Sequence, residues 1–211
     1  MKNIKKRLLS LVLAVVMVLS MSMSVFAAGT PRATGTVNVK FYVNSEYAST
    51  ALAGYTLQGN GYFASTTYNV NLSQITQCPV TKPDGFKGLF DFGDETIAYV
   101  PTAFDAFYNA AVTQKGETNN EFVYGFDTQY TKPNENGIYI QKLSGLSTET
   151  LERGDGYWLG TSWAFYVIPD GAEFDPANPN ETFKSDYYPN NVDLQSGKTY
   201  CMIYDLSSEE W

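Results

Sequence analysis

The chain of 211 residues contains no histidine, and this absence excludes several kinds of active site. Ser-His-Asp and Cys-His nucleophile arrangements, histidine general bases and histidine-rich zinc sites all require an imidazole. Glycine-rich phosphate loops of the Walker or dinucleotide type are missing as well. Paired carboxylates could still hydrolyse a glycosidic bond, but among 22 acidic residues a pair arises easily by chance. We therefore expect no enzymatic activity, with a carboxylate-based glycan hydrolase as the alternative.

The N-terminus has the pattern of a secretory signal peptide. Four basic residues precede an apolar run over 8–19, and the small residues around Ala27 suit cleavage after that position. The run is shorter than the roughly 20 residues of a membrane span, and a retained N-terminal anchor is the alternative. We expect residues 1–27 to be removed, 28–35 to form a flexible leader and 36–211 to form one extracellular domain.

Basic residues are few in the exported part of the chain. The expected signal peptide holds four of the 14 basic residues and none of the 22 acidic ones, which leaves the mature chain with a net charge of −12. Such a chain is a poor partner for nucleic acid and repels anionic lipid headgroups. A cationic, neutral or zwitterionic ligand meets no such barrier. We expect no nucleic-acid partner and no membrane insertion after signal cleavage.

Cysteine is limited to Cys78 and Cys201, both in the exported part. An oxidising exterior permits a disulfide, and an even number of cysteines suits one. We predict a bridge between these two residues, and two buried, inert thiols are the alternative.

The aromatic composition favours strands, since the chain has 16 Tyr and 13 Phe. Residues 36–43 alternate between apolar and polar and predict a half-buried first strand. Its buried face would hold Val37, Val39, Phe41 and Val43. Residues 44–68 carry scattered turn residues and predict a long hairpin or meander.

One segment, 102–115, predicts the main helix. Thr102 can cap it, and Asp105 stands where a capping box has its acid. Apolar residues recur at the spacing of one helix face: Phe104, Phe107, Tyr108 and Ala111. A single helix among strands must bury this stripe against a sheet, so an α+β fold follows.

Four later segments predict strands, at 121–126, 137–143, 158–168 and 193–204. The last two enclose a polar, proline-rich loop. Its acidic and amide side chains are ligands that Ca²⁺ prefers, but their spacing does not fit an EF-hand. We interpret them as solvated loop charges and predict no metal site.

The order of these pieces resembles the transcobalamin-like C-terminal domain, a β-grasp module of vitamin B12 carriers and of secreted bacterial proteins. The resemblance covers most of 36–206. It rests on the helix entry at 102–107, a strand ending in glycine at 139–145, an aromatic strand at 162–167 and a late turn with the final strand at 194–200. It implies a β-grasp (ubiquitin-like) mixed sheet packed on one main helix, with loop and hairpin insertions, and a cobalamin-like corrinoid as a ligand.

Aromatic residues carry the binding hypothesis. Alternation along 158–168 places Trp163, Phe165 and Val167 on one face, which we assign to the core. The opposite face and the flanking loops would form an exposed aromatic platform, made of Tyr157, Trp158, Tyr166, Tyr187 and Tyr188. Exposed aromatic clusters mark ligand or protein contact sites, and loop residues packing on one another are the alternative.

These observations predict a secreted, non-catalytic binding module for a cobalamin-like corrinoid or another small ligand. The alternative is a cell-surface adhesin or assembly component that presents a sheet edge to a protein partner. No cofactor is expected beyond such a ligand.

Overall fold

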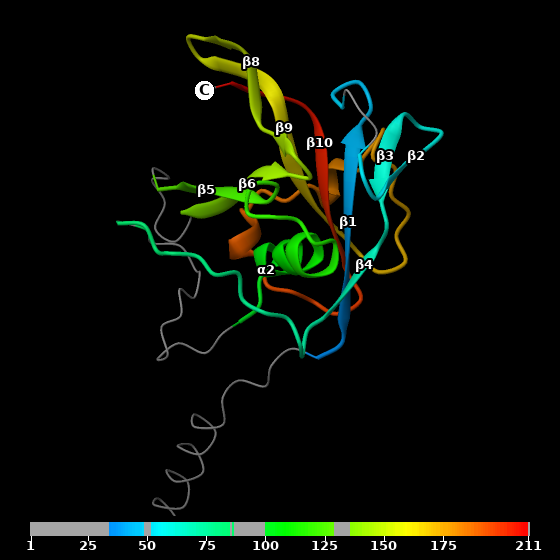
Figure 1. Cartoon of the computed structure of the whole chain (residues 1–211). Helices are drawn as coiled ribbons and strands as arrows, with labels where there is room; N and C mark the ends of the chain where they lie inside the picture. Colours follow the sequence, from blue (N-terminus) through cyan, green and yellow to red (C-terminus); the bar gives the residue numbers. More distant parts are fainter. Residues whose placement is uncertain (1–33, 49–51, 85, 87–99, 129–135, 211) are drawn as a thin grey trace, which may run out of the picture.

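The computed structural model describes residues 34–48, 52–84, 86, 100–128 and 136–210. They form an α+β fold of one seven-stranded mixed sheet, one three-stranded sheet and one main helix (Figure 1). The predicted signal peptide lies outside the described residues, as does most of the predicted leader. Within the described ranges, no helix has the length and apolar character that crossing a membrane requires.

The main sheet has the strand order β2-β3-β1-β10-β9-β8, and β4 also pairs with β1. Its strands are β1 (Thr36–Asn44), β2 (Tyr55–Leu57), β3 (Tyr62–Ser65), β4 (Tyr68–Asn71), β8 (Glu149–Gly154), β9 (Tyr157–Ile168) and β10 (Thr199–Glu210). The central pair, β1 and β10, is parallel, with Val39 opposite Tyr200, whereas the other pairs are antiparallel. A parallel pair needs a crossover connection, which here contains the helix and the small sheet.

The predicted main helix is confirmed. α2 (Ala103–Tyr108) begins at Thr102, whose N–H donates to Asp105 Oδ2 at 2.9 Å in a capping box. The helix continues as the π-helical segment η1 (Asn109–Gln114), after which Lys115 N–H still donates to Ala110 O, five residues back, at 3.0 Å.

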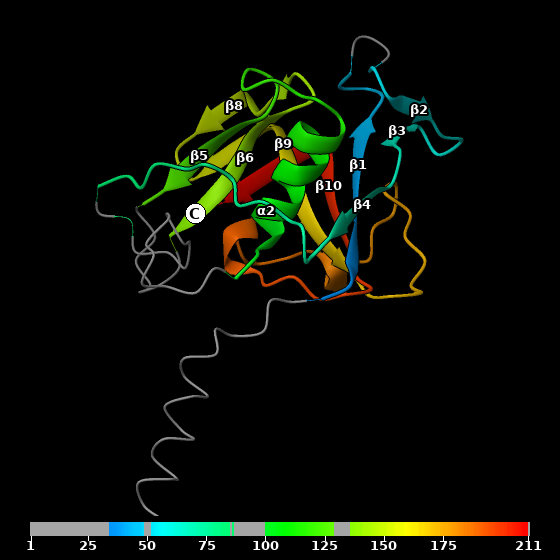
Figure 2. The same ribbon diagram turned by 60° about the horizontal axis from the view of Figure 1, so that its bottom comes forward.

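Phe104 and Phe107 of the helix stripe are buried between the two sheets, and Tyr108 is half-buried. Phe107 meets the main sheet, with ring centroids 6.2 Å from Phe41 and 5.4 Å from Phe165. Phe104 meets the small sheet, edge to face with Tyr124 at 5.5 Å. In Figure 2 the helix lies in front of β10, with β1 on one side and β5 and β6 on the other. Both sheets therefore share one core around the helix.

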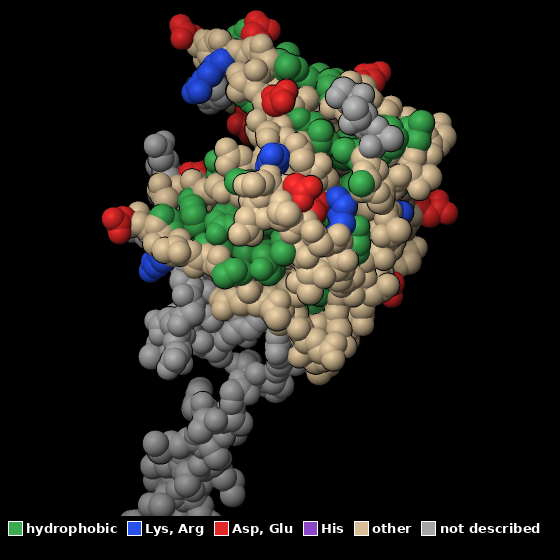
Figure 3. All heavy atoms as spheres, in the orientation of Figure 1, with side chains coloured by type: hydrophobic (Ala, Val, Ile, Leu, Met, Phe, Trp, Pro, Cys, Tyr) green, Lys and Arg blue, Asp and Glu red, His purple; other side chains and the backbone are tan. Residues whose placement is uncertain are grey.

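The small sheet has the order β5-β6-β7 and is built from β5 (Val123–Asp127), β6 (Gly137–Leu143) and β7 (Leu146–Ser147). β6 has the predicted bounds, and β5 begins two residues later than predicted. A two-residue turn joins β6 to β7; its residues Ser144 and Gly145 have φ of 54° and 81°, the left-handed conformation of a tight hairpin turn. On the face shown in Figure 3, hydrophobic side chains lie over β5 and β6, and charged side chains are scattered around them.

The face of the main sheet away from the helix is covered by the loop that follows β9. Alternation along β10 turns Tyr200 and Met202 toward the helix and Cys201 and Ile203 to the other side. There they form a second cluster with Tyr42, Tyr62, Ala64, Tyr166 and Ile168. Phe174 and Phe183 of the loop pack over this cluster. The loop that composition marks as polar and proline-rich thus uses two phenylalanines to bury a sheet face.

The bounds of β10 and the presence of β4 and β8 differ from the sequence prediction. β10 begins at Thr199 rather than Asp193, because 195–198 form a turn in which Lys198 N–H donates to Gln195 O at 3.3 Å. At its other end β10 reaches Glu210 and pairs with β9 back to Tyr157. β4 and β8 were not predicted as separate strands; in β8 every residue before Gly154 is exposed, so the apolar alternation that reveals a strand is missing.

Candidate functional site

A cleft of about 620 Å³ opens between β9, β6 and the segment that follows the β9 loop. Its lining combines aromatic side chains with hydroxyl and charged groups. The aromatic residues are Tyr139, Trp163, Phe165, Tyr187 and Tyr188, and the charged ones are Lys184, Asp186 and Glu209. Concave sites with apolar walls and a few placed polar groups are typical of small-ligand sites.

The cleft exists because the main sheet splits beside β9. β8 pairs with β9 only as far as Glu149 opposite Thr161. The residues just before β8 belong to β7 and pair with β6 instead. Trp163 fills the junction, since its side chain is only 8% exposed and its Nε1 donates to Leu146 O at 3.0 Å. Beyond the junction, Ser185 N–H donates to Phe165 O at 2.9 Å and closes the far end of the opening.

Tyr187 and Tyr139 are the lining aromatics that a ligand can reach. Tyr187 is 60% exposed and Tyr139 is 37% exposed. Tyr188 is half-buried, and its hydroxyl donates to Asp127 Oδ2 at 2.6 Å. Its ring lies so close to Gly137 that a Cβ at that position would clash with it. Tyr188 is therefore a fixed wall, whereas Tyr187 projects into solvent.

The predicted aromatic platform is wrong as a single surface. Tyr187 and Tyr188 do line the cleft. Tyr166, in contrast, is 5% exposed and packs against Phe174 with ring centroids 5.7 Å apart. Its burial raises its pKa to about 12. The prediction failed because it left the second sheet face to solvent, whereas the loop after β9 covers that face.

Tyr157 and Trp158 lie at the far end of β9, in its hairpin with β8, and do not line the cleft. Both are half-buried. Trp158 Nε1 donates to Thr150 Oγ1 at 2.9 Å, and the Tyr157 hydroxyl donates to Glu152. The assignment of Trp163 and Phe165 to the core is confirmed, because both are buried in the cluster that contains the helix.

The predicted disulfide is also wrong, since Cys78 and Cys201 are both free and buried. Cys78 belongs to the cluster on the helix side of the sheet, where its N–H donates to Asp105 Oδ1 at 3.0 Å. Cys201 belongs to the cluster on the opposite side. The sheet separates the two sulfurs. Burial raises the pKa of both thiols well above the ordinary value, which suppresses the reactive thiolate.

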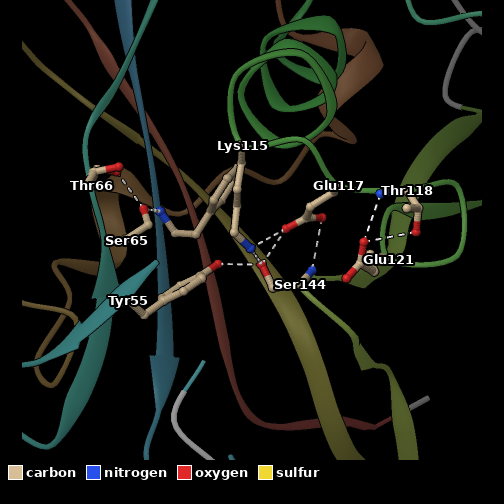
Figure 4. Close-up of polar contacts among 9 residues, drawn as sticks. Tyr55, Ser65, Thr66, Lys115, Glu117, Thr118, Glu121 and Ser144 are labelled. Atoms are coloured by element: carbon tan, nitrogen blue, oxygen red, sulfur yellow. Dashed lines mark hydrogen bonds and ion pairs between the residues drawn. The ribbon is translucent and has the colours of Figure 1, made fainter. Parts of the chain in front are cut away.

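A polar cluster that sequence reasoning missed joins three distant segments (Figure 4). Lys115 Nζ donates to Glu117 Oε1 at 2.5 Å and to Ser144 Oγ at 2.8 Å. Ser144 Oγ also lies 2.7 Å from Glu117 Oε1 and 2.7 Å from the Tyr55 hydroxyl. Lys115 Nζ stands 4.9 Å from the centre of the Tyr55 ring, a cation–π distance. No sequence motif marks these residues, because they come from β2, the end of the helix and the β6–β7 turn.

The contacts of this cluster are those of a structural hydrogen-bond network rather than of a nucleophile site. A serine nucleophile needs a neighbouring base with a free lone pair. Lys115 is an ammonium group in an ion pair and cannot accept a proton. The Glu117 carboxylate, whose side chain is 4% exposed, accepts from Ser144 Oγ but is neutralised by that same ion pair, which makes it a poor base. The left-handed φ of Ser144 is that of its hairpin turn. The contacts therefore hold the helix end to the small sheet.

In the described ranges, no group of three or more carboxylate or thiol side chains lies close enough together to hold a metal ion. In the acidic loop, Asp175 Oδ1 accepts from Asn60 Nδ2 at 2.7 Å and from Ala177 N–H at 3.0 Å. That carboxylate shapes the loop.

Comparison with known proteins gives no match to a protein-family model, a curated protein or a solved structure. The function has to be argued from the site itself.

Proposed function

We propose that this protein is a secreted, non-catalytic binding module and that the cleft beside Tyr187 is its ligand site. The proposal rests on the combination of an open cleft of about 620 Å³ with two tyrosine rings that a ligand can reach. Small-ligand sites usually measure about 300–1,000 Å³. Lys184, Asp186 and Glu209 can orient a polar ligand between those rings.

We also propose that the fold is a β-grasp similar to the transcobalamin-like domain. A first strand parallel to the last, with the main helix packed across their shared face, supports this proposal. The proposed ligand is a cobalamin-like corrinoid or another small neutral or cationic molecule. The mature charge of −12 favours such ligands over anions. Extracellular localisation is proposed from the signal-peptide pattern of 1–27.

The test uses the purified chain from residue 28 onward and cyanocobalamin as the probe. Binding would be followed by the change in visible absorption and by calorimetric heat. We expect Tyr187→Ala and Tyr139→Ala to weaken binding at least about tenfold, because tyrosine anchors dominate contact energies. Leu57→Ala is the matched control, since Leu57 is 56% exposed but lies on β2, at the opposite edge of the main sheet from β9 and β8.

Two results would contradict the proposal. Absence of both heat and spectral change removes the corrinoid as the ligand. If a ligand binds to the Tyr187 and Tyr139 variants as tightly as to the Leu57 variant, the cleft is not the site.

The alternative function is a surface adhesin or assembly component that binds a protein partner. The open edge of β8, exposed from Glu149 to Arg153, favours it. Cross-linking followed by light scattering at increasing concentration would test for assembly of the chain with itself. An unchanged monomer mass would remove self-assembly.

A further inference from the structure

We infer that the cleft binds a short extended peptide segment, which pairs its main chain with the open edge of β9 at Trp163. The inference rests on the proposed role of the cleft as a ligand site and names the class of partner.

The main-chain groups of β9 point alternately to its two edges. In an antiparallel strand the N–H and C=O of one residue point to the same edge, and successive residues alternate between edges. Phe165 O accepts from Ser185 N–H at 2.9 Å, on the side away from β10. Trp163, two residues earlier, therefore directs its N–H and C=O to that same outer edge.

The pairing on the other side of β10 gives the same result independently. Asn38 N–H of β1 donates to Lys198 O at 3.0 Å, so in the parallel ladder Lys198 and Tyr200 face β1. Cys201 then faces β9, where its partner is Tyr166. The even-numbered residues of β9 thus bond to β10, and the odd-numbered ones point outward.

The outer edge of β9 is open around Trp163. Thr161 is paired with Glu149 of β8, and Phe165 O accepts from Ser185 N–H. Among the residues that the structure describes, none hydrogen-bonds to the main-chain N–H or C=O of Trp163. The four residues of this stretch, 162–165, all line the cleft. Main-chain groups in such a position need a partner, because leaving them unpaired away from water is costly.

The described parts of the chain leave this gap unfilled. The residues just before β8 would have to continue its pairing along β9, but they form β7 and pair with β6 instead. Two of its carbonyls are engaged by side chains: Leu146 O accepts from Trp163 Nε1 at 3.0 Å, and Ser147 O accepts from the Tyr204 hydroxyl at 2.7 Å. These contacts hold β7 away from the edge and keep the gap open.

The shape and charge of the gap define the peptide. The open stretch of β9 spans about three residues, roughly 10 Å at the rise of a strand, so the partner is a short segment or a chain end. Main-chain pairing supplies affinity, and alternate side chains supply specificity. The exposed rings of Tyr187 and Tyr139 flank this position. Asp186 and Glu209 outnumber Lys184 in the cleft and, with the acidic mature chain, favour lysine or arginine in the segment.

The premise is tested by amide hydrogen exchange on the mature chain, measured by nuclear magnetic resonance. We expect the Trp163 amide to exchange at least tenfold faster than that of Ala164, its neighbour on the same strand, which bonds to β10. Equal protection of the two amides would show that the edge is already paired and would overturn the inference, whatever the cleft binds.

The binding step is tested with acetyl-Lys-Val-Lys-amide and with the same peptide N-methylated at valine. We expect the first peptide to shift the Trp163 and Phe165 amide signals and to slow exchange at Trp163. The methylated peptide should bind at least tenfold more weakly, because it cannot donate that main-chain hydrogen bond. Equal binding of both peptides, or no change at Trp163 with the first, would overturn the inference.

Parallel titrations with cyanocobalamin separate this inference from the proposed function. If the corrinoid binds in a Tyr187-dependent way and the peptide does not bind, the ligand site stands and the peptide inference falls. If neither binds, both fall.

Discussion

Phe107→Ala is the sharpest test of the core that surrounds the helix. Phe107 is completely buried, and its ring meets Phe41 of β1 and Phe165 of β9. Deleting a buried phenylalanine ring usually costs about 3–5 kcal/mol, because apolar contacts are lost and a cavity remains. The gain in helix propensity on placing alanine there is below about 0.7 kcal/mol. We therefore expect the free energy of unfolding to fall by about 3–5 kcal/mol.

Guanidinium denaturation of the mature chain, followed by tryptophan fluorescence, would measure this loss. The midpoint should fall while the denaturant slope stays unchanged, which marks a loss of stability without a change in the surface exposed on unfolding. Tyr187→Ala is the control and should change stability by less than about 0.5 kcal/mol, as is usual at exposed positions. A loss of that small size for Phe107→Ala would refute the packing of the helix between the sheets.

Three further outcomes are expected. Iodoacetamide added to the unfolded, unreduced mature chain should alkylate both Cys78 and Cys201, and an intact mass without alkylation would contradict the free thiols. Lys115→Met should cost about 1–3 kcal/mol by leaving the Glu117 carboxylate without its cation. The added change Glu117→Gln should recover part of that loss, and a strictly additive loss would contradict the coupling. Burial raises the pKa of Tyr166 from 10.0 to about 12 in the folded chain. Above pH 10 the tyrosine therefore ionises first in the unfolded chain, which lowers the free energy of unfolding. The stability that the neutral Tyr166 contributes is complete below pH 10 and is lost as the pH rises toward 12. Tyr166→Phe should lessen the fall in unfolding free energy measured between pH 10 and pH 11.5, and an unchanged fall would contradict the shift.

The local elements of this chain could be predicted from the sequence. The capping pair Thr102 and Asp105 and the stripe through Phe104 and Phe107 specified the helix, because capping and helical spacing act over only a few residues. Strict alternation specified the first strand, and β9 was found from its run of aromatic and β-branched residues. The burial of Trp163 followed from the same alternation. The resemblance to the transcobalamin-like domain, and the ligand that it implies, stay predictions.

What covers each face was decided by the tertiary structure. Alternation showed that Tyr166 and Trp163 lie on opposite faces of the strand. It did not show that Phe174 and Phe183 of the following loop cover Tyr166. An even number of cysteines permitted a bridge, whereas the position of Cys201 on the far face of β10 forbids one to Cys78.

The cleft likewise depends on contacts that no local pattern contains. It forms because the consecutive strands β7 and β8 pair with β6 and with β9, respectively, so that the two sheets separate beside Trp163. Tyr187 reaches this opening from a loop about twenty residues further along the chain. Local spacing determines which side of a strand a residue occupies, whereas only long-range packing determines whether solvent, a loop or a ligand meets that side.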